Sequence, residues 1–289
     1  MTHPLLTTPN IVYTLESTEH TMEPSTFQDI EKELGVIHNE NCLETMARLR
    51  DNAIDLVVTS PPYDDMRSYD GNNILEFKDI ASALYRVCSQ GGVVVWVIGD
   101  QTIKGNESGT SFRHALFFKE VGFNLFDTMI YLKPPRGAVG NNKTYWQSFE
   151  YMFVLSKGTP KTINLICDRE NKGARHGDNG TKRLHNGTLY HHHRGGYGKF
   201  GRRTNVWEYA IGKGHSTKDA QAFDYPAIFP ESLASDHILS WSNEGDVVYD
   251  PFMGSGTTAK MAQIHKRHWL GSEINPDYVD IANGRIRWF

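Results

Sequence analysis

Cysteine is scarce in this sequence of 289 residues, which contains only three. Cys42, Cys88 and Cys167 show no paired spacing, so we expect free thiols in a reducing compartment rather than a disulfide framework or a zinc site. Long apolar runs are also missing. The longest clear run, Val93–Ile98, suits a buried strand and is far shorter than the ~20 residues of a membrane-spanning helix. We therefore expect no membrane partner.

A basic leader is absent from the N-terminal residues. Residues 1–34 carry Glu16, Glu19 and Glu23 and resemble neither a secretion signal nor a transit peptide, which predicts a cytoplasmic protein. Their periodicity is weak and turn formers are frequent. This segment is expected to be an extension, either packed on the core or partly disordered.

The sequence has little net charge, with a formal value of −4. The charges are unevenly placed, however. Residues 157–218 contain thirteen Lys or Arg and four Asp or Glu, a local balance of +9 that leaves −13 for the rest of the chain. Binding an anionic polymer requires a local positive surface rather than a positive total, so this segment is a candidate nucleic-acid-binding region.

Strand and helix patterns alternate along most of the chain, whose 39% hydrophobic and 22% charged residues are typical of a globular domain. This rhythm predicts an α/β fold with a doubly wound, mainly parallel sheet and helices on both faces. The alternation divides the chain into residues 1–34, 35–157, 158–220 and 221–289. The predicted strands are Val36–Cys42, Ile54–Thr59, Val93–Ile98, Phe126–Leu132 and Tyr151–Leu155, and the predicted helices are Glu44–Leu49, Ile80–Cys88 and Phe112–Val121.

Residues 158–220 interrupt the α/β pattern with sequence rich in glycine, histidine and basic residues. Arginine can grip phosphate or guanine edges with two hydrogen bonds, and asparagine can read adenine. A solvated charged loop is the alternative. His191–His193 predict no metal site, because consecutive residues do not easily converge on one ion and no cysteine is spaced as a partner. The predicted DNA contacts are Arg183, Arg194, Lys199, Arg202, Arg203 and Asn205.

The most informative motif is Ser60-Pro61-Pro62-Tyr63, at the end of the apolar run Ile54–Thr59. An exocyclic amino group conjugated to a base ring is a poor nucleophile, and it attacks only when both of its N–H groups donate hydrogen bonds. The Ser60 hydroxyl and the Pro61 carbonyl can accept them, Pro62 fixes the turn, and Tyr63 offers a ring face for a flipped base. An ordinary proline-rich turn is the alternative.

A second motif has the pattern of a strand, a glycine-rich turn and a helix. Its glycines let a cofactor approach the backbone, and the helix N-terminus can receive a carboxylate. The glycine spacing is not that of a dinucleotide fingerprint. A second apolar strand then ends at Glu273, where an open α/β sheet presents an acid to ribose hydroxyls, so a nucleoside cofactor is predicted. The motif is Asp250-Pro251-Phe252-Met253-Gly254-Ser255-Gly256-Thr257-Thr258.

Together the two motifs resemble the amino-group DNA methyltransferases of the N4-cytosine and N6-adenine family, which use S-adenosyl-L-methionine. The catalytic motif precedes the cofactor motif, the permuted order of the group called the beta class. The resemblance covers most of residues 35–157 and 221–289. It implies a Rossmann-like methyltransferase fold with a catalytic half, an inserted target-recognition region at 158–220 and a cofactor-binding half.

The resemblance also implies roles for single residues. Asp250 would hold the cofactor's ammonium, Phe252 and Gly254 would shape its pocket, Thr257 would help to bind its carboxylate and Glu273 its ribose. The chain departs from the family at Asn41, where an acid is common, and at Tyr225 and Phe149, where histidine is common. The full expected cofactor set is Asn41, Ser232, Asp250, Pro251, Phe252, Gly254, Ser255, Gly256, Thr257 and Glu273.

The identity of the residue at position 60 indicates which base is methylated. In the resembling family, Ser at the first motif position favours cytosine N4 and Asp favours adenine N6, so N4 methylation of double-stranded DNA is predicted and N6 methylation is the alternative. An RNA or protein-amide methyltransferase and an inactive DNA-binding adaptor are remoter alternatives. The sequence leaves open a partner restriction endonuclease and the choice between monomer and homodimer.

Overall fold

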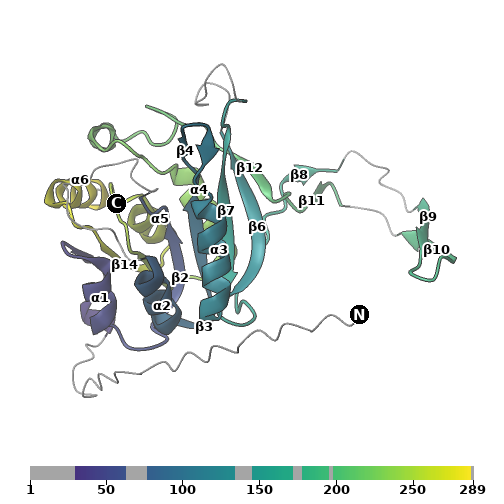
Figure 1. Ribbon diagram of the computed structural model, residues 1–289, viewed down its shortest axis with the longest axis horizontal. Coiled ribbons are helices and arrows are strands. Elements are labelled where there is room, and N and C mark those ends of the chain that lie inside the picture. Colours follow the sequence, from purple (N-terminus) through teal and green to yellow (C-terminus); the bar gives the residue numbers. More distant parts are fainter. Residues whose placement is uncertain (1–29, 63–76, 134–144, 172–177, 195–197, 288–289) are drawn as a thin grey trace, which may run out of the picture.

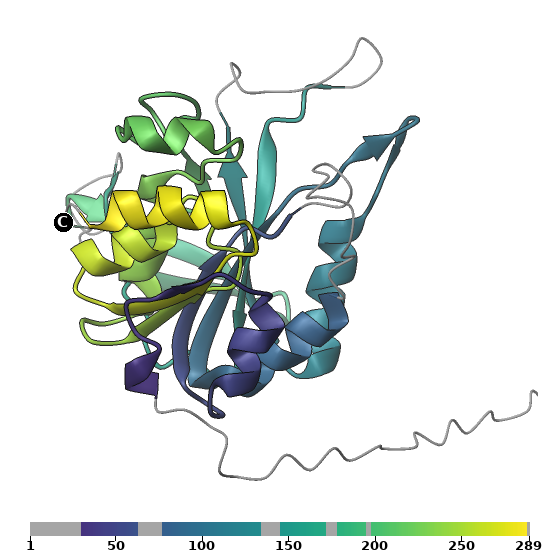
Figure 2. The same ribbon diagram turned by 90° about the vertical axis from the view of Figure 1, so that its left-hand side faces the viewer.

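The computed structural model describes residues 30–62, 77–133, 145–171, 178–194 and 198–287 (Figures 1 and 2). Its central element is an eight-stranded sheet. Strands β1, β14, β13, β2 and β3 pair in parallel, β7 runs antiparallel to both β3 and β6, and β12 pairs in parallel with β6. In sheet order these are β1 (Ile37–His38), β14 (His268–Ser272), β13 (Val247–Asp250), β2 (Ile54–Thr59), β3 (Cys88–Ile98), β7 (Phe149–Ser156), β6 (Asn124–Leu132) and β12 (Val206–Glu208).

Helices cover both faces of the sheet (Figure 2). Side chains of β3 alternate between two cores: Val94 and Trp96 pack with the first three helices, and Val93 and Val95 with the last three. The predicted doubly wound α/β fold is therefore confirmed. No helix in the described part of the chain is long and apolar enough to cross a membrane. The helices are α1 (Cys42–Arg48), α2 (Phe77–Val87), α3 (Thr110–Val121), α4 (Glu231–Trp241), α5 (Thr257–Ile264) and α6 (Pro276–Ile286).

The connections place both sequence motifs at one point of the sheet. From β2 the chain proceeds through α2 to β3, whereas from β13 it proceeds through α5 to β14 on the other side. The order of the strands therefore reverses between β2 and β13, which are direct neighbours. Ligands of open α/β sheets bind at the carboxyl ends of the strands at such a switch point. Ser60 follows β2 and Pro251 follows β13 at this edge.

Most observed boundaries differ somewhat from the sequence prediction, and the largest differences are at β1 and β3. The strand expected over Val36–Cys42 is only Ile37–His38, because the Asn41 side chain accepts a hydrogen bond from the Leu43 N–H at 2.9 Å and starts α1 at the next residue. The helix expected to end at Cys88 ends at Val87. Strand β3 then begins and runs for eleven residues, five more at its start than predicted.

The basic segment is only partly separate from the sheet. Strand β12 lies within residues 158–220 yet pairs with β6, and Trp207 and Tyr209 are buried in the core. The part that projects from the body is the arm, defined here as residues 168–171, 178–194 and 198–203 (Figure 1). It contains the pairs β8 (Arg169–Glu170) with β11 (Phe200–Gly201) and β9 (Asp178–Arg183) with β10 (Leu189–Arg194). Short elements elsewhere are β4 (Thr102–Ile103), β5 (Asn106–Glu107) and the 3-10 turns Ile30–Lys32 and Ala220–Asp224.

Candidate active site

Direct side-chain contacts join the two motifs although 191 residues separate Thr59 from Asp250. The Thr59 hydroxyl donates to Asp250 Oδ1 at 2.6 Å, and the Phe252 N–H donates to the same oxygen at 3.0 Å. Thr258, in the first turn of α5, donates from its hydroxyl to the Val58 carbonyl at 3.0 Å. The turn after β2 and the glycine loop after β13 are thus held as one unit.

A cavity of about 420 Å³ lies over this unit. Ser60 and Pro61 line it from the first motif, and Asp250, Phe252 and Thr257 line it from the second. Residues 225–230, which precede α4, close a further side. One cavity therefore contacts the predicted amine-orienting turn and the predicted cofactor loop, as transfer between two bound reactants requires.

The two glycines of the loop are required by backbone geometry and by close packing. Gly254 has φ +51° and Gly256 has φ +79°, both in the left-handed region. A Cβ at Gly254 would lie 2.6 Å from the hydroxyl oxygen of Tyr225, and one at Gly256 would lie 2.8 Å from the Cβ of Ala282. Tyr225, where the resembling family has histidine, therefore packs directly on the loop.

Two buried acids stand at the ends of the neighbouring strands β13 and β14. Burial raises the pKa of Asp250 to about 6 and also raises the pKa of Glu273 above its usual value. Glu273 accepts from the Gly254 N–H at 2.8 Å and from the Asn275 N–H at 2.9 Å. Within the described ranges no Lys or Arg forms an ion pair with either acid. Asp250, which lines the cavity, is therefore the carboxylate that suits a positively charged ligand there.

Only some of the other predicted cofactor residues line the cavity. Ser255 and Thr257 line the cavity, and both hydroxyls accept hydrogen bonds from Arg285, at 2.9 and 3.1 Å. Asn41 caps α1, and Ser232 is exposed on α4; neither lines the cavity. Glu273 contacts the glycine loop from behind rather than lining this cavity. Pro251 continues the chain from Asp250 into the loop.

A buried ion-pair cluster behind the loop was missed by sequence reasoning. Arg285 contacts Asp219 at 3.0 Å and Glu231 at 2.8 Å, and Lys260 contacts the same two acids at 2.7 and 2.8 Å. Burial opposes ionisation of Asp219, but hydrogen bonds from Lys260 and Arg285 hold its pKa below the usual value. The cluster ties α4, α5 and α6 together beneath the hydroxyls of the glycine loop. Its members are far apart in sequence, so no local pattern indicates it.

Three residues on the opposite wall of the cavity were also not predicted. Tyr131 and Lys133, at the end of β6, and Glu150, at the start of β7, line it together. Lys133 and Glu150 form an ion pair. Because β7 is antiparallel to β6, its first residues lie at the same sheet edge as the last residues of β2 and β13.

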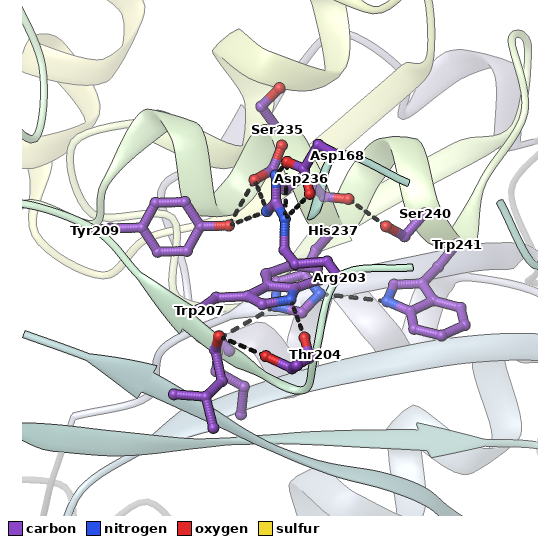
Figure 3. Close-up of polar contacts among 12 residues, drawn as sticks. Asp168, Arg203, Thr204, Trp207, Tyr209, Ser235, Asp236, His237, Ser240 and Trp241 are labelled. Carbon is purple, nitrogen blue, oxygen red and sulfur yellow. Dashed lines mark hydrogen bonds and ion pairs between the residues drawn. The ribbon is translucent and has the colours of Figure 1, made fainter. Parts of the chain in front are cut away.

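Arg203, predicted as a DNA contact, forms ion pairs within the protein (Figure 3). Its guanidinium pairs with Asp168 and, at 2.7 Å, with Asp236 of α4, and it lies 5.0 Å above the Trp207 ring. The Tyr209 hydroxyl also donates to Asp236 at 2.6 Å. Two carboxylates pair with this guanidinium, and these ion pairs join the base of the arm to α4 of the body.

The remaining predicted DNA contacts lie on the arm or beside it. Arg183 donates to the Gly187 carbonyl in the β9–β10 turn, and Lys199 lies over the Phe200 ring at 5.2 Å. Arg202 is exposed, and the exposed Asn205 donates to the Thr128 carbonyl of β6 at 3.0 Å. The side chain of Arg194 and the whole of Tyr63 fall outside the described residues. Pro62 is partly buried beside Pro61.

The described residues contain no cluster of His, Cys, Asp or Glu that could hold a metal ion. Of the cysteines, Cys42 and Cys88 are buried, and burial raises the pKa of each thiol to about 12. Cys167 is exposed, and all three are free. Buried thiols with raised pKa values are poor nucleophiles, and no described cysteine lines the cavity.

Comparison with known proteins gives one family. The family model described as DNA methylase matches residues 54–284. The orphan methyltransferase M.BamHII of Bacillus amyloliquefaciens is 55% identical over 240 residues, which cover 82% of this chain and 90% of that relative. Among solved structures, the cytosine-N4-specific PvuII DNA methyltransferase has a TM-score of 0.63 at 21% identity over 88% of both chains.

A second solved structure is TTHA0409 of Thermus thermophilus in complex with S-adenosyl-L-methionine. It has a TM-score of 0.57 at 21% identity and covers 88% of this chain and 92% of that chain. Both structural likenesses support the fold. The family model spans most of the chain, including both motifs and the cavity between them, and so the chain belongs to the DNA methylase family of N6 and N4 amino-group methyltransferases.

Proposed function

We propose that this amino-group DNA methyltransferase transfers the methyl group of S-adenosyl-L-methionine to the N4 amine of a cytosine flipped out of double-stranded DNA. The observation that carries the proposal is the shared cavity, in which Ser60 and Pro61 face the same space as the loop from Asp250 to Thr257. The serine at the first motif position favours cytosine. The cytosine-N4-specific PvuII enzyme, whose fold is similar, agrees with that choice.

The residues present fit this cofactor. When bound, it supplies an activated methyl group on a sulfonium centre and leaves as a neutral thioether. Asp250 is placed to pair with its ammonium, because the carboxylate lines the cavity and has no cationic partner among the described side chains. Gly254 lets the ligand approach the backbone, and the Thr257 hydroxyl can bind its carboxylate. Glu273 is proposed to bind the ribose.

The amine is prepared by two fixed acceptors. Hydrogen bonds from both N–H groups to the Ser60 hydroxyl and the Pro61 carbonyl draw the nitrogen lone pair out of conjugation with the ring. The Thr59–Asp250 hydrogen bond holds this turn against the cofactor loop, so orientation is built into the fold. Positioning and electrostatics thus supply the rate enhancement, without an ionisable nucleophile.

The methylated base is tested by product analysis. Unmodified DNA is incubated with the enzyme and S-adenosyl-L-methionine, digested to nucleosides and analysed by mass spectrometry. An Asp280→Asn variant, altered at an exposed residue of α6, is a control that should give the same product. We expect N4-methylcytosine. If N6-methyladenine is the only product, the target base is adenine rather than cytosine, and the proposed type of reaction stands. The absence of any methylated nucleoside would refute the proposed activity.

The arm is proposed to bind the DNA backbone. Arg202→Ala combined with Arg183→Ala removes two exposed positive charges, each able to release counterions from a phosphate. The slope of log affinity against log salt should therefore become shallower by about 0.9 for each phosphate that the variant no longer neutralises. Fluorescence anisotropy with a labelled duplex measures it.

Lys119→Ala on α3 serves as the charge control for the arm, because Lys119 is exposed on the body. This variant should keep the wild-type slope. Equal slopes for the wild type, the double variant and Lys119→Ala would show that Arg183 and Arg202 do not bind the DNA backbone. The arm would then be interpreted as a solvated loop.

A further inference from the structure

The hydroxyl of Tyr131 is an unexplained polar group in the cavity wall. Tyr131 is 2% exposed, and its hydroxyl oxygen has no hydrogen-bond partner in the described part of the protein. A buried hydroxyl without a partner costs roughly 1–3 kcal/mol, so natural proteins retain few of them. The same residue lines the cavity that contains Ser60 and Pro61. A ligand in that cavity could supply the missing partner.

The sheet order places Tyr131 on the side of the target base. Strand β13, with Asp250, lies on one side of β2, whereas β3, β7 and β6 follow on the other side. The Ser60-Pro61 turn therefore separates the cofactor loop from the wall formed by Tyr131, Lys133 and Glu150. With the cofactor held at Asp250, the amine acceptor lies beyond Ser60, toward this wall.

The phenol ring is held in one orientation. In the sheet, Tyr131 is the register partner of Glu150 on β7 and of Trp207 on β12. The Lys133 ammonium lies 5.5 Å from the centre of its ring, and the Tyr209 ring packs against it at 5.9 Å. Burial, together with the charge of Glu150, raises the pKa of the Tyr131 hydroxyl, which therefore stays protonated and able to donate.

We infer that Tyr131 is a base-recognition residue, whose hydroxyl donates a hydrogen bond to the ring nitrogen beside the methylated amino group. This inference rests on the proposed methylation of a flipped base. In cytosine the acceptor is N3, next to C4, and in adenine it is N1, next to C6. A thymine or a guanine carries a protonated ring nitrogen there, so the contact would also reject bases whose ring offers no acceptor.

A chemical double-mutant cycle tests the contact. Tyr131→Phe removes the hydroxyl and keeps the ring, and a duplex with 3-deazacytosine at the target removes the N3 acceptor and keeps the amine. Wild type and variant are each assayed on both duplexes. If the two groups bond to one another, Tyr131→Phe lowers kcat/KM about tenfold on cytosine and leaves it unchanged on 3-deazacytosine, because the effects of interacting groups are not additive.

Other outcomes separate the inference from the function on which it rests. A structural hydroxyl would reduce the rate by the same factor on both duplexes, which overturns the inference while methylation of cytosine persists. If the product is N6-methyladenine, the cycle is run with 1-deazaadenine, and additivity there again overturns it. Tyr209→Phe is the matched control: it alters a buried phenol beside Tyr131 that does not line the cavity, and equal losses on both duplexes are expected.

Discussion

Ser60→Ala is expected to lower kcat for methyl transfer about 100-fold or more while leaving the dissociation constant of S-adenosyl-L-methionine unchanged. The substitution removes one of two acceptors that orient the amine, and loss of one such oriented group in an active site typically costs about 100- to 1,000-fold in kcat. The cofactor loop is untouched, since Thr59 still donates to Asp250 at 2.6 Å. Single-turnover methylation with labelled cofactor measures the rate, and calorimetric titration measures the affinity.

Ser82→Ala is the matched control for this experiment. Ser82 is exposed on α2, where its hydroxyl donates to the Lys78 carbonyl of the same helix. The control should turn over at the wild-type rate. A Ser60→Ala enzyme that is equally fast would show that the hydroxyl has no part in preparing the amine, and a parallel loss of cofactor binding would show that the turn acts through the cofactor loop instead.

Asp250→Asn should weaken binding of S-adenosyl-L-methionine by about 3 kcal/mol, on the order of 100-fold in Kd, because a charge-assisted hydrogen bond to the ammonium is lost. The amide keeps the shape of the side chain and an oxygen that can accept from Thr59. The same change should not lower the melting temperature at pH 7. Burial raises the pKa of Asp250 to about 6, so the ionised form costs stability above that pH in the free protein.

The pH dependence of this affinity provides an independent check. A cationic ligand binds the ionised carboxylate, so wild-type affinity should be full above about pH 6 and should fall as the pH drops through the pKa of Asp250. The Asn variant has no carboxylate to protonate and should show a flat profile across this window, whereas Asp280→Asn on the exposed face of α6 should behave as wild type. A flat wild-type profile would contradict the role of Asp250.

The sequence alone determined the features that are encoded locally. The alternation of apolar strands and helices predicted the doubly wound sheet. Each motif lies in one continuous stretch of the chain, a strand followed by a turn, so its chemistry could be predicted from neighbouring residues. The glycines at 254 and 256 follow the same rule, because a tight turn requires positive φ whatever surrounds it.

Only the tertiary structure decided how distant side chains share their partners. Arg203 looks like any other arginine of a basic segment, yet the fold brings Asp168 and Asp236 to it and turns it into an anchor. Tyr131 belongs to an ordinary apolar strand, and its hydroxyl becomes notable only because the fold buries it without a partner in a residue that lines the same cavity as Ser60. Such contacts depend on where each strand lies in the sheet, and strand order is set by packing over the whole chain rather than by any local pattern.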